Sequence, residues 1–114
     1  LLSMLGLEHE HVFTDVPSGV PQKDPAFAAL NPFLQIPVLV DGDVVVWDSQ
    51  AILVYLARRY GPDWFPLDPR PAAQVMQWLS VATNEINASL QQARLFYLLG
   101  EHGDIETLTK KGLR

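Results

Sequence analysis

Two adjacent polar residues, Asp48 and Ser49, stand directly before an apolar stretch that predicts a helix over Gln50–Tyr60. The unpaired N–H groups at a helix start, together with the Ser49 hydroxyl, form a small anion site. The Asp48 carboxylate beside that site suits an ammonium group. A carboxylate and an ammonium are the two charges of a free or γ-linked amino acid, so the pair suits such a ligand. Plain N-capping, which contributes about 1 kcal/mol and needs no ligand, is the alternative.

A second candidate is Gln35-Ile36-Pro37, immediately before an apolar run that predicts a strand. A proline that opens a strand is confined to a sheet edge or to a special peptide geometry. With a cis Ile36–Pro37 bond, the Ile36 backbone turns outward and can pair with a peptide ligand laid alongside as an added strand. Gln35 is then placed to reach a terminal carboxylate of that ligand. A trans proline that simply begins the strand is the alternative, and the local sequence leaves both open.

The elements that must position these residues are a hairpin and the helix after it. Pro37–Trp47 contains two β-branched runs around Asp41-Gly42, a pair that tolerates the positive φ angles of a tight turn. Because the runs are nearly continuous in apolar residues, we expect both faces of the hairpin to be covered. The helix over Gln50–Tyr60 is apolar on most sides, which is typical of a core helix, and Gly61 ends it.

Three shorter elements are expected before the hairpin. Leu1–Leu7 is strongly apolar and is interpreted as the last turns of a buried helix. His9–Val16 alternates between apolar and polar residues, which predicts a strand. Lys23–Leu30 predicts a short helix with Asp24 as its N-cap, and Asn31 ends it because a residue before proline avoids the helical region.

A proline-rich stretch follows the hairpin and its helix. From Gly61 to Pro71 there are four prolines, which is typical of a tied-down linker. Beyond it, Pro69–Leu99 carries apolar residues alternately three and four positions apart, which predicts one long helix. A further helix is expected over Ile105–Lys111, so the second half of the chain is predicted to be all helical.

The composition argues against several classes of protein. The net charge of −5 and the pI near 4.9 speak against a nucleic-acid-binding surface, which needs clustered Lys and Arg. With no cysteine, the 114 residues hold no disulfide, thiolate metal site or cysteine nucleophile. His9, His11 and His102 lack companions at metal-ligand spacing, so no metal is expected. No apolar run approaches the ~20 residues that span a bilayer, and a cytoplasmic location is expected.

The run N-P-F-L-Q-I-P-V-L-V-D-G-D, followed by W-D-S-Q-A-I-L-V-Y-L-A-R-R-Y-G, resembles the glutathione transferase family. The likeness covers essentially the whole chain, and we take it to be closest to the cytosolic, bacterial-type members. It implies a thioredoxin-like α/β domain over residues 1–61 that lacks its first strand. A linker over 62–68 and the start of an all-helical domain over 69–114 would follow.

The resemblance also implies a role for each candidate site residue. Pro37 would be the cis-proline, and the Ile36 backbone would bind the cysteinyl part of glutathione. Asp48 and Ser49 would hold the γ-glutamyl amine and carboxylate. Gln35 would approach the glycyl carboxylate.

Activity and assembly are further implications of the resemblance. Glutathione would be the co-substrate, its thiolate would attack an electrophilic small molecule, and the protein would be a homodimer. The tyrosine, serine or cysteine that stabilises the thiolate would precede Leu1, so the catalytic residue stays unassigned and the chain is expected to be truncated at both ends.

The expected missing first strand has a consequence for folding. That strand is central in the family sheet, so His9–Val16 and Pro37–Val40 would lose their shared neighbour, and we expect the chain alone neither to fold stably nor to catalyse. Two other functions stay open on the same fold: a non-catalytic binding or scaffold module, and a glutathione-dependent reductase or isomerase.

Overall fold

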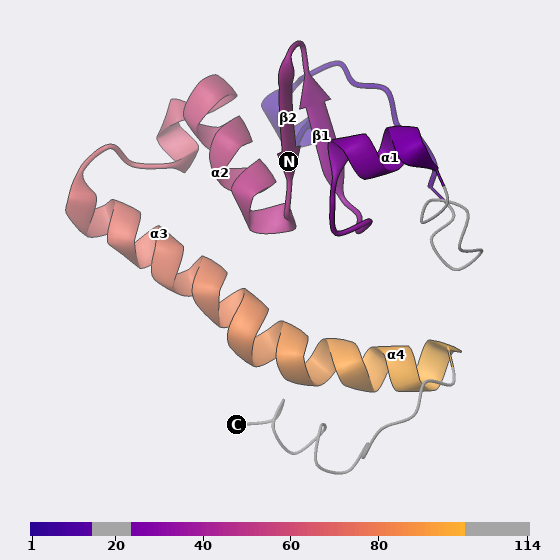
Figure 1. Cartoon of the computed structure of the whole chain (residues 1–114). Helices are drawn as coiled ribbons and strands as arrows, with labels where there is room; N and C mark the ends of the chain where they lie inside the picture. The colour runs from indigo at the N-terminus through magenta and orange to yellow at the C-terminus, as the bar shows by residue number, and fades with distance from the viewer. Residues whose placement is uncertain (15–23, 100–114) are drawn as a thin grey trace. The chain divides into compact units, whose positions relative to one another are not determined.

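The structure, a computed structural model, describes residues 1–14 and 24–99 (Figure 1). The chain divides into two units, of which the first is Leu1–Pro66 and the second begins at Leu67. An antiparallel hairpin is the centre of the first unit, and a long helix makes up the described part of the second. Among the described helices, none combines the length and the apolar character that crossing a membrane requires.

The predicted hairpin is confirmed, with its turn displaced by one residue. β1 (Val38–Asp41) and β2 (Val44–Trp47) pair antiparallel. Because Asp41 already belongs to the ladder, the turn consists of Gly42 and Asp43 rather than the expected Asp41-Gly42. Gly42 has a φ of 62°, the left-handed region that a side chain disfavours and that tight hairpin turns require.

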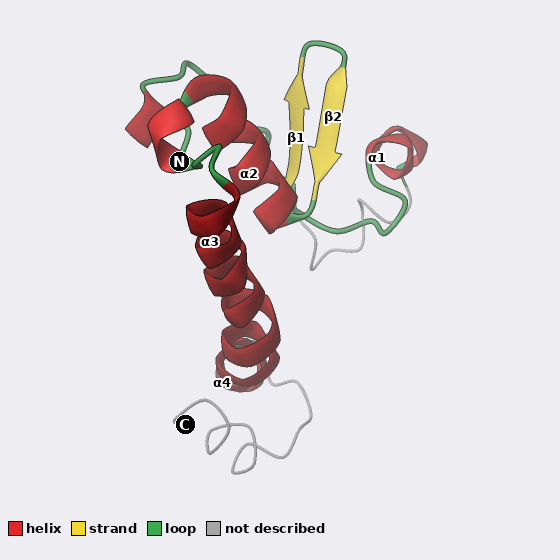
Figure 2. Cartoon of the chain, turned by 90° about the vertical axis from the view of Figure 1, so that its left-hand side faces the viewer, coloured by secondary structure: helices red, strands yellow, loops and turns green. Residues whose placement is uncertain are grey.

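The two helices predicted around the hairpin are also confirmed. α1 (Pro25–Leu30) begins after Asp24, whose side chain accepts a hydrogen bond from the backbone near the helix start. α2 (Ser49–Tyr60) begins after Asp48 and ends at Gly61. α2 packs against both strands of the hairpin, so the hairpin and α2 form one structural element (Figure 2).

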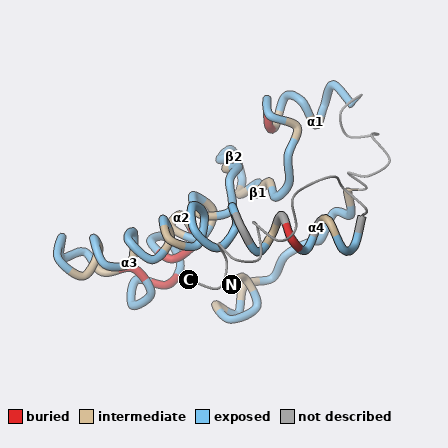
Figure 3. The backbone as a smooth tube through the Cα atoms, turned by 90° about the horizontal axis from the view of Figure 1, so that it is seen from below, coloured by how far each residue is buried: buried red, intermediate tan, exposed pale blue. Residues whose placement is uncertain are grey.

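One face of the hairpin is uncovered by the described residues. The Asp41 side chain bonds to α2, so the strand positions in phase with it face that helix. Val40 and Val45 oppose each other on the other face and are 56% and 41% exposed. The prediction that both faces are covered is therefore wrong here, because the apolar pattern reports the tendency to be covered and not the presence of a covering element. Buried positions are confined to short stretches (Figure 3).

The first residues are only partly as expected. Ser3–Leu5 forms a 3₁₀ turn closed by Gly6 in the left-handed conformation, which confirms a helical end. It is not buried, since Met4 is 69% exposed. The strand predicted over His9–Val16 is wrong for residues 9–14, which form no strand, and its last two positions lie outside the described residues. A strand exists only through pairing, and no described segment pairs with this one.

The second unit contains the predicted long helix. α3 (Pro69–Val81), a π-helical segment (Ala82–Gln91) and α4 (Gln92–Leu99) follow one another without a break, which confirms a helix over Pro69–Leu99. The widened middle segment was not predicted, because three-and-four spacing defines an apolar face and not the hydrogen-bond register. The helix expected over Ile105–Lys111 lies outside the described residues.

Candidate functional site

The predicted ligand-binding residues meet at one end of the hairpin. Val38 pairs with Trp47, so Pro37 and Asp48, the next residues outward, leave the ladder as neighbours. Both connections lie at the end opposite the turn in two perpendicular views (Figures 1 and 2). We call this region, made of Gln35–Pro37 with Asp48 and Ser49, the open end of the hairpin.

All predicted site residues are accessible at the open end. The five predicted residues are all exposed: Gln35, Ile36, Pro37, Asp48 and Ser49. The Ile36–Pro37 peptide bond is cis, one of the two geometries that the sequence leaves open. Among the described residues, neither the N–H nor the C=O of Ile36 makes a hydrogen bond. An exposed and unpaired backbone unit of this kind can pair with an extended peptide.

Among the described residues, Asp48 is one of three aspartates that cap helices, and its backbone differs from the other two. Its Oδ1 accepts hydrogen bonds from the N–H groups of Gln50 and Ala51 at 2.9 and 3.0 Å, so the capping alternative is realised. Asp24 and Asp68 cap α1 and α3 from ordinary extended conformations, with φ of −89° and −61°. Asp48 has φ 79° and ψ 125°, a strained conformation for a non-glycine residue. Capping alone does not require this backbone.

The loop that leads into β1 is organised by Asn31, which is 2% exposed. Its Oδ1 accepts from the Phe33 N–H at 2.9 Å and its Nδ2 donates to the Gln35 C=O at 2.7 Å. The loop is tight enough that Leu34 takes a left-handed φ of 57°. Asn31 was expected only to end a helix. The sequence signal, a polar residue before proline, does not reveal that the side chain is buried inside the loop.

An aromatic contact ties this loop to the other side of the open end. The rings of Phe33 and Trp47 lie 5.2 Å apart between centroids, tilted by 59°. Trp47 immediately precedes Asp48, so the loop and the start of α2 are held together by packing as well as by the ladder.

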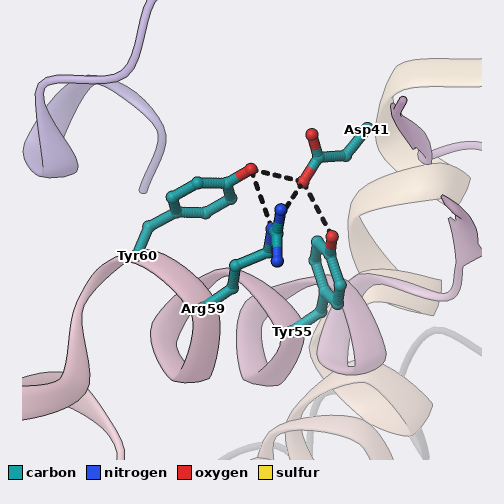
Figure 4. Close-up of polar contacts among 4 residues, drawn as sticks. All are labelled: Asp41, Tyr55, Arg59 and Tyr60. Carbon is teal, nitrogen blue, oxygen red and sulfur yellow. Dashed lines mark hydrogen bonds and ion pairs between the residues drawn. The ribbon is translucent and has the colours of Figure 1, made fainter. Parts of the chain in front are cut away.

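A second polar cluster, not predicted, lies at the turn end of the hairpin (Figure 4). It consists of Asp41 on β1 and Tyr55, Arg59 and Tyr60 on α2, and we call it the turn-end cluster. The Asp41 Oδ2 accepts from the hydroxyls of Tyr55 at 2.7 Å and Tyr60 at 2.5 Å. The Arg59 Nε lies 3.3 Å from the same oxygen and donates to the Tyr60 hydroxyl at 3.0 Å. The cluster therefore joins the hairpin to α2.

The contacts in the cluster shift the pKa values of Asp41 and Tyr55 in the directions that keep Asp41 ionised and Tyr55 protonated. The hydroxyls of Tyr60 and Tyr55 hold the pKa of Asp41 below its ordinary 3.8. The hydrogen bond to Asp41 raises the pKa of Tyr55 above its ordinary 10.0. Tyr55 and Arg59 are four residues apart and therefore share a helix face, a spacing from which this part of the cluster could have been predicted. Within residues 1–14 and 24–99, no group of three or more His, Asp or Glu side chains could hold a metal ion.

Sequence comparison finds one family for the first half of the chain. The family model described as glutathione S-transferase, N-terminal domain, matches residues 1–58. Glutathione S-transferase 3 of Zea mays is 42% identical over 89 residues, which cover 76% of this chain and 40% of the relative. Glutathione S-transferase D7 of Drosophila melanogaster is 38% identical over 112 residues, which cover 93% and 49%. The chain thus spans less than half the length of these relatives.

Solved structures agree with the sequence matches. A delta-class glutathione transferase of Nilaparvata lugens matches with a TM-score of 0.83 and 32% identity, over 97% of this chain and 53% of that one. The transferase URE2P6 of Phanerochaete chrysosporium, in complex with oxidized glutathione, matches with a TM-score of 0.86 and 29% identity, over 99% and 55%. Glutathione S-transferase-I bound with lactoylglutathione matches with a TM-score of 0.80 and 29% identity, over 98% and 57%.

These matches confirm the predicted fold class and correct one part of the expected resemblance. A thioredoxin-like domain with a two-stranded sheet and helices, followed by the start of a helical domain, is confirmed. The bacterial-type assignment has no support, because the relatives named above come from a plant, insects and a fungus.

Proposed function

The chain belongs to the glutathione S-transferase family, and from that membership we propose that the protein binds glutathione at the open end of its hairpin. The bound tripeptide presents its thiolate for attack on an electrophilic small molecule. One observation carries the proposal: the ladder register makes Pro37 and Asp48 neighbours. The proposal is supported by the Ile36 backbone, which has no hydrogen-bond partner among the described residues and lies next to the charged start of α2. These two features suit a peptide that ends in an amino-acid group.

Each part of the tripeptide has a partner in the proposal. The Ile36 backbone pairs with the cysteinyl part as an added strand. The Asp48 carboxylate binds the γ-glutamyl ammonium, and the Ser49 hydroxyl and N–H bind the γ-glutamyl carboxylate. The Gln35 amide binds the glycyl carboxylate. The strained backbone of Asp48 supports its place in this set, since strain of this kind clusters at functional sites.

The chemistry belongs to the sulfur of the ligand. In this proposal glutathione supplies the thiolate, which is the nucleophilic form. Its sulfur forms a bond to the electrophilic carbon, and the displaced electron pair leaves with the leaving group or takes up a proton. A hydrogen bond to the sulfur would lower the thiol pKa. We assign that role to none of the described residues.

We propose in addition that the whole protein is a cytoplasmic homodimer. Exposed apolar side chains support the dimer, since Leu53 on α2 is 40% exposed and Trp78 on α3 is 70% exposed. Light scattering on the full-length protein measures the oligomeric state, and a monomer at micromolar concentration would exclude the dimer.

Calorimetric titration of the full-length protein with glutathione tests the binding site. The double variant Asp48→Ala, Ser49→Ala should lose roughly 100-fold in affinity, because hydrogen bonds to charged groups contribute about 1.5–3 kcal/mol each. Asp68→Ala is the matched control, since it removes the cap of α3 and no group of the open end. If the double variant binds glutathione as tightly as the wild type, the pocket assignment is wrong.

A further inference from the structure

The direction of the Gln35–Ile36 peptide unit is set by one buried side chain. The Gln35 C=O accepts a hydrogen bond of 2.7 Å from the Nδ2 of Asn31. This peptide bond is trans, and the N–H of a planar trans unit points opposite to its C=O. Because the Gln35 C=O turns inward to a residue that is 2% exposed, the Ile36 N–H is aimed outward at the open end.

Asn31 is itself held in a single orientation. Its backbone N–H donates to the Phe27 C=O at 3.0 Å, which anchors the loop to α1. Its C=O accepts from the Leu34 N–H at 3.0 Å, and its Oδ1 from the Phe33 N–H at 2.9 Å. A backbone N–H can only donate and a backbone C=O can only accept, so these partners establish which side-chain atom is oxygen and which is nitrogen. The donor that reaches Gln35 is therefore Nδ2.

We propose that Asn31 is a positioning residue for glutathione: it aims the Ile36 N–H at the cysteinyl carbonyl of the ligand without touching the ligand itself. The inference rests on the proposed function. Without the Nδ2 donor, the Gln35 C=O is released and the peptide unit can rotate. The Ile36 N–H then has to be ordered each time glutathione binds, and that ordering lowers the affinity.

Two substitutions remove the donor and keep the rest of the loop. Asn31→Asp is nearly isosteric and retains the acceptor for the Phe33 N–H, but it turns an oxygen toward the Gln35 C=O. Asn31→Ser can keep the short bond to the Phe33 N–H and cannot reach Gln35. Each variant is expected to bind glutathione about tenfold more weakly, the effect of losing about one hydrogen bond. If one variant shows no folding transition in a thermal melt, the glutathione affinity of the other variant tests the role of Asn31.

A ligand analogue separates aiming from a general loosening of the loop. In the analogue, a trans alkene replaces the cysteinyl–glycine peptide bond, which removes the carbonyl that accepts from Ile36 and keeps the shape and charge. Calorimetry on the full-length wild type should show the analogue binding about tenfold more weakly than glutathione. In Asn31→Asp and Asn31→Ser, the affinity for glutathione should fall, whereas the affinity for the analogue should stay at its wild-type value. The ratio of the two affinities therefore falls toward one.

The outcomes are distinct. A ratio that stays near tenfold in the variants overturns the role of Asn31, because the Ile36 N–H then keeps its aim without it. A ratio near one in the wild type overturns the contact between Ile36 and the ligand. Wild-type protein that shows no saturable binding of glutathione overturns the proposed function, and the role of Asn31 with it.

Discussion

The two ends of one hairpin use their polar groups in opposite ways. At the turn end, the hydroxyls of Tyr55 and Tyr60 donate to one carboxylate oxygen of Asp41, and Arg59 forms an ion pair with the same oxygen, so the carboxylate is satisfied within the protein (Figure 4). At the open end, the Ile36 backbone unit is exposed and unpaired among the described residues. Polar groups that satisfy one another hold elements together, whereas groups left accessible are available to a ligand.

The two carboxylates at these ends illustrate the difference. Asp41 has an ordinary strand backbone and bonds to side chains far along the chain. Asp48 has a strained backbone and bonds only to its own helix start among the hydrogen bonds of the described residues. We therefore expect substitutions at Asp41 to change stability and substitutions at Asp48 to change binding.

Of the single substitutions that compare the two ends, the one that removes only the charge of Asp48 has the largest expected effect. Asp48→Asn keeps an oxygen that can cap α2 but cannot pair with an ammonium, so glutathione affinity should fall by about tenfold or more with little change in the melting midpoint. Calorimetry and thermal melts of the full-length protein measure the two quantities. Asp24→Asn, which removes the charge from the cap of α1, should bind like the wild type. Unchanged affinity in Asp48→Asn would exclude Asp48 as the ammonium partner.

The reverse pattern is expected at the turn end. Asp41→Ala leaves two hydroxyls without their shared acceptor and a guanidinium without its ion-pair partner. The thermal midpoint should therefore fall by a few degrees while glutathione affinity stays within about twofold. Asp43→Ala is the control, because this neighbouring aspartate lies in the turn and takes no part in the cluster. Equal midpoints for the two variants, or a large loss of binding in Asp41→Ala, would contradict the division between the two ends.

The smallest expected effect is the pH dependence of the turn-end cluster. The folded pKa of Asp41 is lowered, so its contribution is present above the unfolded value of 3.8 and is lost as the pH falls through the folded value. The folded pKa of Tyr55 is raised, so its contribution is present below 10.0 and is lost as the pH rises through the folded value.

The difference in melting midpoint between wild type and Asp41→Ala should be constant between pH 3.8 and pH 10.0 and should shrink outside this range. A difference that stays undiminished below the folded pKa of Asp41 would count against the charged Asp41 as its source.

Features that depend on a few adjacent residues could be predicted from the sequence. The caps Asp24 and Asp48 act on N–H groups two or three residues away, so local residue types suffice. The hairpin was predictable for the same reason, although the exact turn was one residue off, since a ladder can include or omit the residue before glycine. The five open-end residues were proposed from local chemistry and the family resemblance together, and their role in binding stays a prediction.

Features that depend on distant partners could not be predicted. The strand over His9–Val16 has suitable alternation but no described partner, and alternation does not report pairing. The contact of Asp41 with Tyr60 joins residues nineteen positions apart, which only the packing of α2 on the hairpin brings together. Asn31 was missed because burial of its side chain results from the path of the whole loop.

The short ladder between β1 and β2 makes alignment a shared property of both ends. It has four residue pairs, and a slip of one residue would move every strand side chain to the opposite face. Asp41 would then point away from α2, and Pro37 would no longer leave the ladder beside Asp48. A misaligned hairpin therefore loses its anchor and its ligand site in the same event, so a correctly anchored turn end also guarantees a correctly assembled open end.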